Sequence, residues 1–364
     1  MILRDLIGVL EKLIPAGMQE SYDNTGLQIG NTGEEVTRAL ICMDVTMGVL
    51  EEAVTQKCDL VISHHPMIFK PIKKLDFGNE QGLLIAFAVK HNLAVYSMHT
   101  SIDKYRFGVS YALARKLNLE NIQTLKPEEG VLRKLVTFCP SAQAPALRNA
   151  LFSAGAGHIG NYDSCSFNIE GEGSFRALEG TNPYVGKQGE LHSEKETRIE
   201  VAFPDWNKTS VIKSLLANHP YEEVAYDIYP LENSLHTAGL GAVGYLKKAM
   251  GANDFLSSLQ SCFGNMPLKY CTHEKMIKRV AVCGGSGASL LGTAVSVGAD
   301  AYITGDIKYH DFQAASGKIL LADAGHYETE IQVLQVIKEL ISEKIPTFAT
   351  LISETNTNFV KYLK

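Results

Sequence analysis

The sequence predicts an α/β core that is interrupted by an inserted α+β domain. Three observations support this prediction: short β-rich runs alternate with helical patterns in the first third, the same alternation returns in the last third, and the middle differs. Alternating strands and helices are typical of βαβ units and a mostly parallel sheet. With 364 residues, the chain is also too long for one ordinary core.

The first third begins with an amphipathic helical pattern, in which leucine and isoleucine side chains from Leu3 to Ile14 share one face. Residues 48–57 and 82–92 also have helical spacing. The expected strands are short and apolar, at 39–45, 59–63 and 93–98. This alternation predicts βαβ units with parallel strands.

The last third repeats that pattern. Helices are expected at 287–298 and at 328–343. The expected strands are β-rich, at 278–283, 300–305, 318–323 and 345–350. Because both outer thirds show the same alternation of strand and helix patterns, we assign residues 1–125 and 235–364 to a single core of two halves.

The middle, residues 126–234, reads as strand–helix–strand–strand–helix–strand. This order is that of a ferredoxin-like α+β unit. The flanking segments 121–130 and 230–239 are rich in polar and turn residues and are expected to be linkers. An insertion into one α/β core fits this pattern better than two consecutive domains.

The composition argues against nucleic-acid and membrane partners. The chain has 34 basic and 40 acidic residues and a formal net charge of −6, and its densest cationic segment, 70–74, is interrupted by Pro71 and Ile72. Non-specific nucleic-acid binding draws on clustered lysine and arginine. The sequence has no run of about 18 uncharged apolar residues, the length that crosses a membrane.

The cysteines indicate a reducing compartment. There are seven, an odd count, and no two have CxxC spacing, so neither a disulfide framework nor a zinc knuckle is indicated. The N-terminal segment also lacks the basic region and the cleavage site of a signal peptide. We therefore expect a cytoplasmic protein.

Three glycine-rich segments invite a nucleotide-binding interpretation. The GxGxxG matches at 155–160 and 239–244 do not lie between a strand and a helix, which a dinucleotide fingerprint requires. The segment 283–290 does follow a strand and precede a helix, so its amides can form an anion nest. It lacks the lysine and hydroxyl of a P-loop, and a tight turn is the favoured interpretation.

Potential metal ligands follow three of the expected strands. His64 and His65 follow the strand at 59–63, Asp103 follows the strand at 93–98, and His326 and Glu330 follow the strand at 318–323. Sites in open α/β sheets form beyond the carboxyl ends of the strands, so the three segments can converge. A His-His-Pro turn or a helical His-x-x-x-Glu pair is by itself more often structural. Three such features at strand ends favour a metal site.

The spacing of these residues predicts two metal ions. Adjacent His64 and His65 point to opposite sides of the backbone, so two ions about 3.5–4 Å apart can take one each. His326 and Glu330 share a helix face, and Asp103 adds a hard oxygen. Imidazole with carboxylate suits two divalent ions per subunit, Zn, Mn or Fe. Two ions that share a water lower its pKa and supply a nucleophile.

At these residues the chain resembles the Nif-three-like family, whose members are also called homologues of type 2 GTP cyclohydrolase I. The resemblance rests on SHHPMIF, YSMHTSID, TGDIKYHDFQAA and DAGHYETE, and on YDNTGLQIG, where Tyr22 replaces a tryptophan. In the middle, AGAGHIGNYDSCSF, EGTNPYVG and HPYEEVAYDIYPL resemble the extra domain of the longer bacterial members. The likeness spans nearly the whole chain.

The resemblance implies a dinuclear site at His64, His65, Asp103, His326 and Glu330. It also implies a PII-like or CutA-like insert and a toroidal homohexamer with the metals facing inward. The chain departs from the family pattern at 104–110, where it has KYRFGVS in place of small residues and glycines. That departure affects the expected substrate contacts and leaves the expected ligands unchanged.

Two functions remain open. The first is a metal-dependent hydrolase of a small nucleotide-like substrate, GTP ring opening being the named candidate, with Glu330 or His99 as the catalytic proton carrier. The second is a metal carrier or regulatory scaffold that stores iron or zinc with the same ligands. A protein-binding or nucleic-acid-binding adaptor is weaker, because the net charge is acidic.

Roles can also be proposed for other polar residues, in some cases with two alternatives. His99 either holds a ligand in place or acts as a catalytic acid, and His310 with Asp306 either donates to a substrate or caps a strand end. Asp44 is expected to hold a metal ligand in place. In the middle segment, 219–223 is interpreted as a structural turn rather than a binding motif, and Tyr184 and Trp206 as packing or interface residues.

Overall fold

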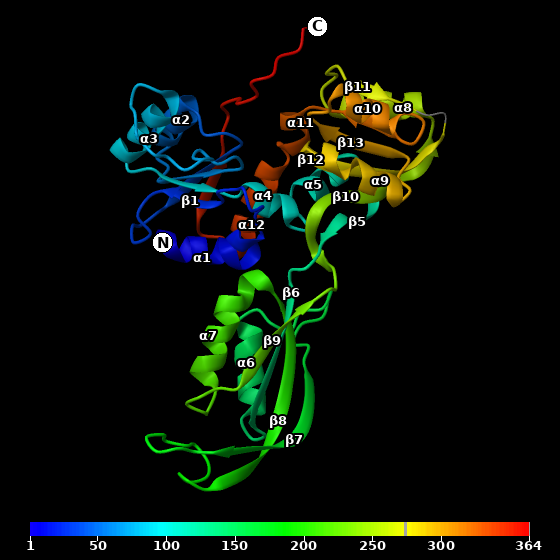
Figure 1. Cartoon of the computed structure of the whole chain (residues 1–364). Helices are drawn as coiled ribbons and strands as arrows, with labels where there is room; N and C mark the ends of the chain where they lie inside the picture. Colours follow the sequence, from blue (N-terminus) through cyan, green and yellow to red (C-terminus); the bar gives the residue numbers. More distant parts are fainter. Residues whose placement is uncertain (273–274, 364) are drawn as a thin grey trace. The chain divides into compact units, whose positions relative to one another are not determined.

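The computed structural model describes residues 1–272 and 275–363. The described chain divides into two compact units, which are considered separately below. Unit 1 combines Met1–Lys126 with Ala238–Lys364, and unit 2 is Pro127–Thr237. Unit 1 holds two sheets and unit 2 holds one (Figure 1).

The first sheet of unit 1 has the strand order β1-β4-β3-β2-β15. The three pairings from β4 to β15 are parallel, and β1 joins β4 antiparallel. Its strands are β1 Gly26–Ile29, β2 Arg38–Cys42, β3 Leu60–Ser63, β4 Ala94–Ser97 and β15 Ala349–Ile352. All the residues of β3 and β4 are buried, as expected for parallel strands that are covered on both faces.

Helices cover both faces of this sheet. Apolar side chains of α1 (Leu3–Leu13) and α12 (Val333–Lys344) pack on one face, and those of α2 (Met47–Thr55) and α3 (Glu80–Lys90) pack on the other. Thr46 and Asn79 cap α2 and α3 by accepting from backbone amides of the first turn. The expected N-terminal amphipathic helix and both expected helices of the first third are confirmed.

The second sheet of unit 1 has the order β11-β14-β13-β12-β10-β5. Strands β12, β13 and β14 are parallel, whereas β11 and β10 pair antiparallel with the outer members of that trio. Its strands are β5 Glu120–Glu128, β10 Leu235–Met250, β11 Lys269–Cys271, β12 Ile277–Ser286, β13 Ala301–Gly305 and β14 Leu320–Asp323. The expectation of a mostly parallel core therefore holds for the first sheet and is wrong for the second.

Four helices pack on the second sheet. The helices α5 (Val109–Lys116) and α8 (Ala252–Cys262) lie on one face, and α9 (Leu291–Ser296) and α10 (Tyr309–Ala315) lie on the other. The helix expected at 287–298 begins as a 3-10 turn, Ala288–Leu290, before α9. Within the described residues, no helix is long and apolar enough to cross a bilayer.

The segments expected as linkers are strands in the structure. Residues 121–128 belong to β5 and residues 235–239 to β10, and these two strands are neighbours in the second sheet. The prediction was wrong because both segments carry polar and turn residues that give a weak apolar signal, although backbone pairing with neighbouring strands makes them strands. Of the two, β5 lies at the edge of the sheet and β10 lies between β5 and β12. The strand expected at 345–350 forms β15 beside β2, so the chain returns to the first sheet.

Unit 2 has the order strand–helix–strand–strand–helix–strand that the sequence predicts. Its elements are β6 Leu132–Pro140, α6 Ala144–Ser153, β7 Phe167–Arg176, β8 Leu191–Pro204, α7 Lys208–Asn218 and β9 Tyr226–Leu231. The antiparallel sheet order β7-β8-β6-β9 is the ferredoxin-like one. Apolar side chains of α6 and α7 cover one face of this sheet.

The remaining helical segments are short. They are the 3-10 turns Ala16–Met18 and Asp205–Asn207 and the helices α4 His99–Lys104 and α11 His326–Glu330. Both α4 and α11 begin immediately beyond the carboxyl end of a parallel strand, β4 and β14 respectively. They therefore carry the side chains that follow those strands.

Candidate metal centre

Three strand ends of unit 1 supply the side chains of the candidate centre. His64 and His65 follow β3, and Asp103 lies in α4. His326 and Glu330 begin and end the short helix α11. Gly325 has φ of 80° before this helix, and a Cβ there would lie 2.1 Å from Glu328 Oε2, so only glycine permits this entry.

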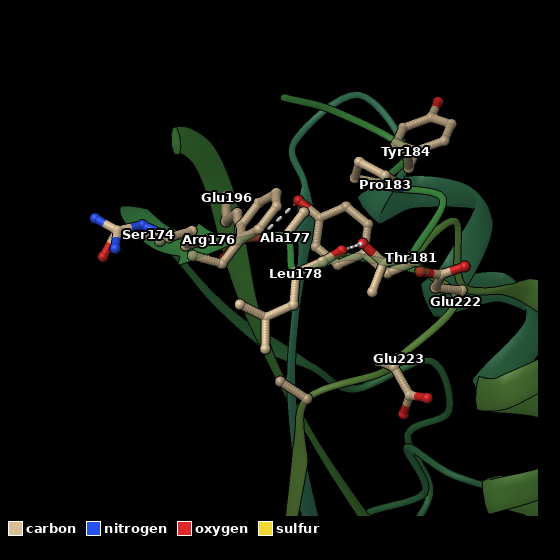
Figure 2. A pocket seen from close by; sticks show the side chains of 14 residues that line it. Ser174, Arg176, Ala177, Leu178, Thr181, Pro183, Tyr184, Glu196, Glu222 and Glu223 are labelled. Atoms are coloured by element: carbon tan, nitrogen blue, oxygen red, sulfur yellow. Dashed lines mark hydrogen bonds between the residues drawn. The ribbon is translucent and has the colours of Figure 1, made fainter. Parts of the chain in front are cut away.

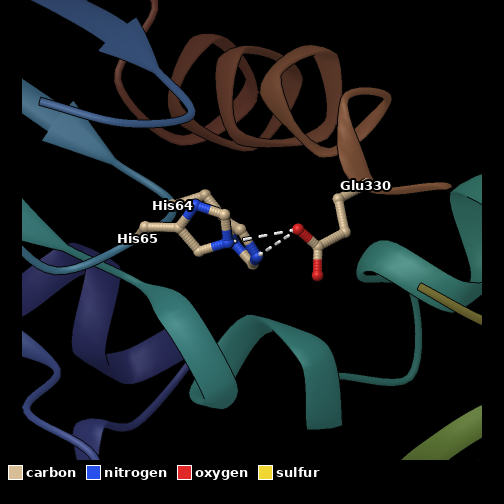
Figure 3. Close-up of side chains that lie close together, drawn as sticks. All are labelled: His64, His65 and Glu330. Carbon is tan, nitrogen blue, oxygen red and sulfur yellow. Dashed lines mark ion pairs between the residues drawn. The ribbon is translucent and has the colours of Figure 1, made fainter. Parts of the chain in front are cut away.

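The imidazole nitrogens converge on one carboxylate. Glu330 Oε2 lies 3.2 Å from Nε2 of His65, 3.2 Å from Nε2 of His326 and 3.6 Å from Nε2 of His64. Asp103 Oδ1 lies 3.8 Å from His64 Nε2. Figure 3 shows both adjacent histidines directed at the Glu330 carboxylate. The five predicted ligands thus lie close together in one cluster.

The buried atoms at this point fit a metal ion. His64 is fully buried, and neither of its ring nitrogens has a hydrogen-bond partner in the described structure. The same holds for Asp103 Oδ1 and Glu330 Oε2. Unpaired buried polar atoms are costly, and a divalent cation would satisfy them together. Ligand atoms of His64, His65 and Glu330 lie within 4.8 Å of one another, close enough to hold one ion.

Three aspartates orient three of the histidines. Oδ1 of Asp44 lies 2.8 Å from His65 Nδ1, and Oδ2 of Asp306 lies 2.7 Å from His326 Nδ1. Each carboxylate accepts from Nδ1 and leaves Nε2 toward Glu330. The expected role of Asp44 agrees with this contact.

His99 forms the third pair. Its Nδ1 lies 2.6 Å from Asp23 Oδ1, and its ring centre lies 5.6 Å from that of His64 and 5.5 Å from that of His65. Asp23 also accepts from Thr100. Asp23 is the site residue that sequence reasoning did not single out, because it precedes β1 and follows no apolar strand. Its only signal was its place in the YDNTGLQIG segment.

His310 and Asp306, which the sequence places four residues apart, contact different partners in the structure. His310 Nδ1 lies 3.2 Å from Gln313 Oε1, whereas Asp306 faces His326. Asp306 follows the end of β13 with φ of 58°, a left-handed conformation that is unusual outside glycine. This backbone turn directs the carboxylate at His326.

Burial and neighbouring charges set the pKa values of the centre. Burial lowers the pKa of His64 to about 4, so this ring is neutral. Burial opposes protonation of His65 too, but the Asp44 and Glu330 carboxylates outweigh it and raise its pKa to about 10. The Glu330 carboxylate, with Asp306, raises the pKa of His326 to about 9 against the effect of burial. The metal-free centre therefore holds protons where cations would bind.

The glycines at the end of β12 make room for Glu330. Gly285 has φ of 62°, and a Cβ there would lie 2.1 Å from Glu330 Oε1. The Gly285 amide donates to Thr329 Oγ1 at 3.0 Å, and the Thr304 hydroxyl donates to the Gly285 carbonyl at 2.9 Å. The tight-turn interpretation of 283–290 therefore agrees with the structure, and the glycine serves a close side-chain approach.

The fold and the site together define an α/β protein with a candidate metal centre where strand ends of its two sheets meet. A family profile described as Duf34/NIF3 (NGG1p interacting factor 3) matches residues 1–359. The chain belongs to this family, as the resemblance of its motifs predicted.

Curated relatives support the same assignment. A protein of Halalkalibacterium halodurans named "GTP cyclohydrolase 1 type 2 homolog" is 37% identical over 343 residues, which cover 93% of this chain and 91% of the relative. A Bacillus subtilis protein of the same name is 36% identical over 366 residues, covering 99% and 98%. Relatives of this name therefore match essentially the whole length of the chain.

Solved structures share the fold. A Bacillus cereus protein related to NIF3 superposes with a TM-score of 0.84 at 34% identity, covering 99% of both chains. A Staphylococcus aureus protein gives a TM-score of 0.77 at 29% identity, covering 100% of this chain and 99% of the other. Both matches include the middle unit as well as the core.

Proposed function

We propose that this protein is a metal-dependent hydrolase of a small nucleotide-like molecule, with two divalent ions held by His64, His65, Asp103, His326 and Glu330. The observation that supports it most is the set of buried nitrogen and oxygen atoms that converge on Glu330 without a hydrogen bond. Mixed imidazole and carboxylate ligands suit Zn, Mn or Fe. When bound, such ions polarise a substrate oxygen and activate water at neutral pH.

Glu330 and His99 have different roles in this proposal. Glu330 is 4% exposed and lies among three imidazoles, so it would hold metal together with them. His99 is paired at Nδ1 with Asp23, which leaves Nε2 free to accept and return a proton. We therefore assign the proton-carrying role to His99 in preference to Glu330.

Aromatic rings beside His99 favour a planar substrate. The Phe69 ring centre lies 6.0 Å from that of His99, and the Tyr22 ring centre lies 6.4 Å from that of Phe69. Tyr22 is 66% and Phe69 is 41% exposed, so both rings offer a face to solvent next to the centre. Stacking on such faces is how proteins hold nucleobases. The name of the curated relatives makes GTP the first substrate to try.

The backbone around these rings is held in place. Asn24 Nδ2 donates to the Ile68 carbonyl at 2.6 Å, and the Ile68 amide donates to Gln28 Oε1 at 2.7 Å. Hydrogen bonds thus link the segment of Tyr22 and Asp23 to the segment of Phe69.

Reconstitution followed by a substrate screen tests the proposal. Protein loaded with Zn, Mn or Fe is assayed against nucleoside mono-, di- and triphosphates, beside His99→Gln and the control His310→Gln, which changes an exposed histidine outside the centre. We expect turnover that His99→Gln reduces at least roughly 100-fold without metal loss, the usual worth of a general acid–base. Absence of turnover together with metal transfer to an apo-acceptor would replace this proposal with the metal-carrier function.

A further inference from the structure

Unit 2 contains a pocket that the metal centre does not use. Its volume is about 440 Å³, within the range of small-molecule sites. It is lined by residues of β7, by the following loop to Tyr184, by Glu196 of β8 and by the turn at 221–225. Figure 2 shows these side chains. Glu196 faces away from α6 and α7, because Ile199 on the same strand packs under those helices and successive side chains alternate.

Aromatic rings form one side of the pocket. The Tyr221 ring centre lies 6.1 Å from that of Phe175 and 6.2 Å from that of Tyr184, with the ring planes tilted by 57° and 53°. The rings therefore do not stack in parallel on one another, and Tyr184 remains 53% exposed. Three aromatic rings that are not stacked on one another thus line the pocket, and the face of an aromatic ring is electron-rich.

The charged groups of the lining are mainly carboxylates. Glu196, Glu222 and Glu223 oppose a single cation, Arg176. In Figure 2 the Arg176 guanidinium extends away from the carboxylates of Glu222 and Glu223. Among the described residues, Glu223 has no hydrogen bond or ion pair. The lining residues thus carry more negative than positive formal charge, which disfavours anions and favours cations.

The turn that carries Tyr221 is fixed before any ligand arrives. His219 is buried, its Nε2 lies 2.8 Å from the Phe138 carbonyl, and its Nδ1 accepts from the Tyr221 amide at 3.1 Å. Burial lowers the pKa of His219, which keeps the neutral ring that these two bonds require. The structural interpretation of this turn therefore agrees with the contacts of His219, while Tyr221 faces the pocket.

Glu196 is fixed as well. The Tyr221 hydroxyl donates to Glu196 Oε1 at 2.8 Å. The other oxygen, Oε2, occupies the space above Gly173, where a Cβ would lie 2.2 Å away. A glycine in a strand often marks such a close approach. Ring and carboxylate are therefore joined into one preformed surface.

We propose that this pocket binds a small organic cation carrying an ammonium or guanidinium group. The tilted rings attract the cation through their faces, and the glutamates supply the opposite charge. Neutral rings alone would suit an apolar guest, but such a guest would desolvate three carboxylates while adding no positive charge to balance them. An anionic guest would meet charge of its own sign. The proposal is independent of the hydrolase function and of the metal ligands.

Calorimetry on the full-length protein tests the proposal with choline as the probe. Its uncharged isostere, 3,3-dimethylbutan-1-ol, has the same shape without the charge. We expect choline to bind at least roughly ten-fold more tightly than the isostere, which corresponds to the usual worth of a cation–π contact with charge assistance. Raised salt should weaken choline binding and leave the isostere unchanged. Equal affinity for both probes would overturn the proposal. Absence of binding heat in a titration that reaches about 20 mM choline, about twenty times a Kd of 1 mM, would also overturn it.

Variants locate the binding within the chain. Glu196→Gln keeps the shape and removes a charge, and Gly173→Ala displaces the Glu196 carboxylate while leaving every charge in place. Both should weaken choline binding roughly ten-fold. The matched control is Glu170→Gln, an exposed glutamate of β7 outside the pocket. Thermal unfolding of each variant checks folding, and a control variant that weakens binding as much as Glu196→Gln would refute this location.

Discussion

Each of three histidines at the centre has its Nδ1 atom in contact with an aspartate carboxylate. Asp44, Asp306 and Asp23 hold Nδ1 of His65, His326 and His99 through contacts of 2.6–2.8 Å. Such a contact sets the tautomer and raises the basicity of the opposite nitrogen. The fourth histidine, His64, has no such partner, and burial, assisted by the neighbouring His65 and His99, lowers its pKa and keeps it neutral. The aspartates are therefore as much part of the site as the ligands are.

Asp44→Asn tests this support at a single residue. The amide cannot stabilise charge on His65 as the carboxylate does, so divalent-metal affinity should fall about 10- to 100-fold. Competition with a fluorescent chelator measures the loss. Asp254→Asn, at an exposed position in α8, is the control for a surface aspartate. If both variants bind metal equally well, Asp44 does not support His65.

Metal affinity should rise with pH. The raised pKa values of His65 and His326, about 10 and about 9, keep both rings protonated in the metal-free protein at pH 7. Binding displaces those protons, so affinity should increase about ten-fold per pH unit for each proton released, up to pH ~9. Chelator competition at pH 6.5, 7.5 and 8.5 measures the slope. A flat profile contradicts the protonated resting state.

The same shifts predict the opposite trend for the stability of the metal-free protein. A folded pKa above the unfolded value of about 6.5 adds stability that is complete below pH ~6.5 and is lost as pH rises toward 9–10. The melting temperature of the metal-free protein should therefore fall over this range. Metal-loaded protein provides the contrast, because its imidazoles no longer titrate.

At the scale of the element, the centre depends on how strands end. In β3, β4 and β14 the chain leaves a buried parallel strand and the polar residues follow at once. The end of β12 contributes differently, through Gly285, which lets the Glu330 carboxylate approach its backbone. Parallel strands bring their carboxyl ends to one edge of each sheet, which is why residues of distant sequence meet.

Gly285→Ala tests the contribution of this strand end. A methyl group there would collide with Glu330 Oε1, and the left-handed φ would cost about 1–2 kcal/mol in addition. We expect lower stability and loss of most bound metal. Gly298→Ala is the matched control, because Gly298 has φ of 72° and nothing within 4 Å. Equal metal content in the two variants would show that the approach of Glu330 is not needed.

At the scale of the whole molecule, the candidate metal centre and the aromatic pocket lie in different units. Every residue of the candidate metal centre lies in unit 1, and every residue of the aromatic pocket lies in unit 2. The strands β5 and β10, which lead into and out of unit 2, are neighbours in one sheet of unit 1. The pairing of β5 with β10 therefore joins the two chain segments of unit 1 at the point where unit 2 is inserted.

Deletion of residues 127–237 tests this independence. Joining Lys126 to Ala238 through an Asn-Gly turn should leave unit 1 folded with its full metal content, because no ligand is removed. Elemental analysis and circular dichroism measure both properties. The full-length chain is the reference, and the same deletion carrying His65→Ala is the control for specific binding. A folded product that binds no metal would show that the centre requires unit 2.

The site residues differed in how visible they were in the sequence. His64, His65, Asp103, His326 and Glu330 stand next to apolar strands, so a local rule was enough to propose them as ligands. Asp23 and the pairing of Asp306 with His326 were not predicted, because their partners are 76 and 20 residues away and no periodicity links them. The pocket of unit 2 was not predicted either, since its rings come from three separate segments.

The sequence alone determined the local elements of this protein and the chemistry of its polar residues. Apolar periodicity and turn residues act within a few positions, so they specify strands, helices and the residues that follow them. Only the tertiary structure decided that β5 and β10 pair, that β15 returns to the first sheet and that Gly285 faces Glu330. These depend on backbone pairing and side-chain approach between distant segments, which no local pattern encodes.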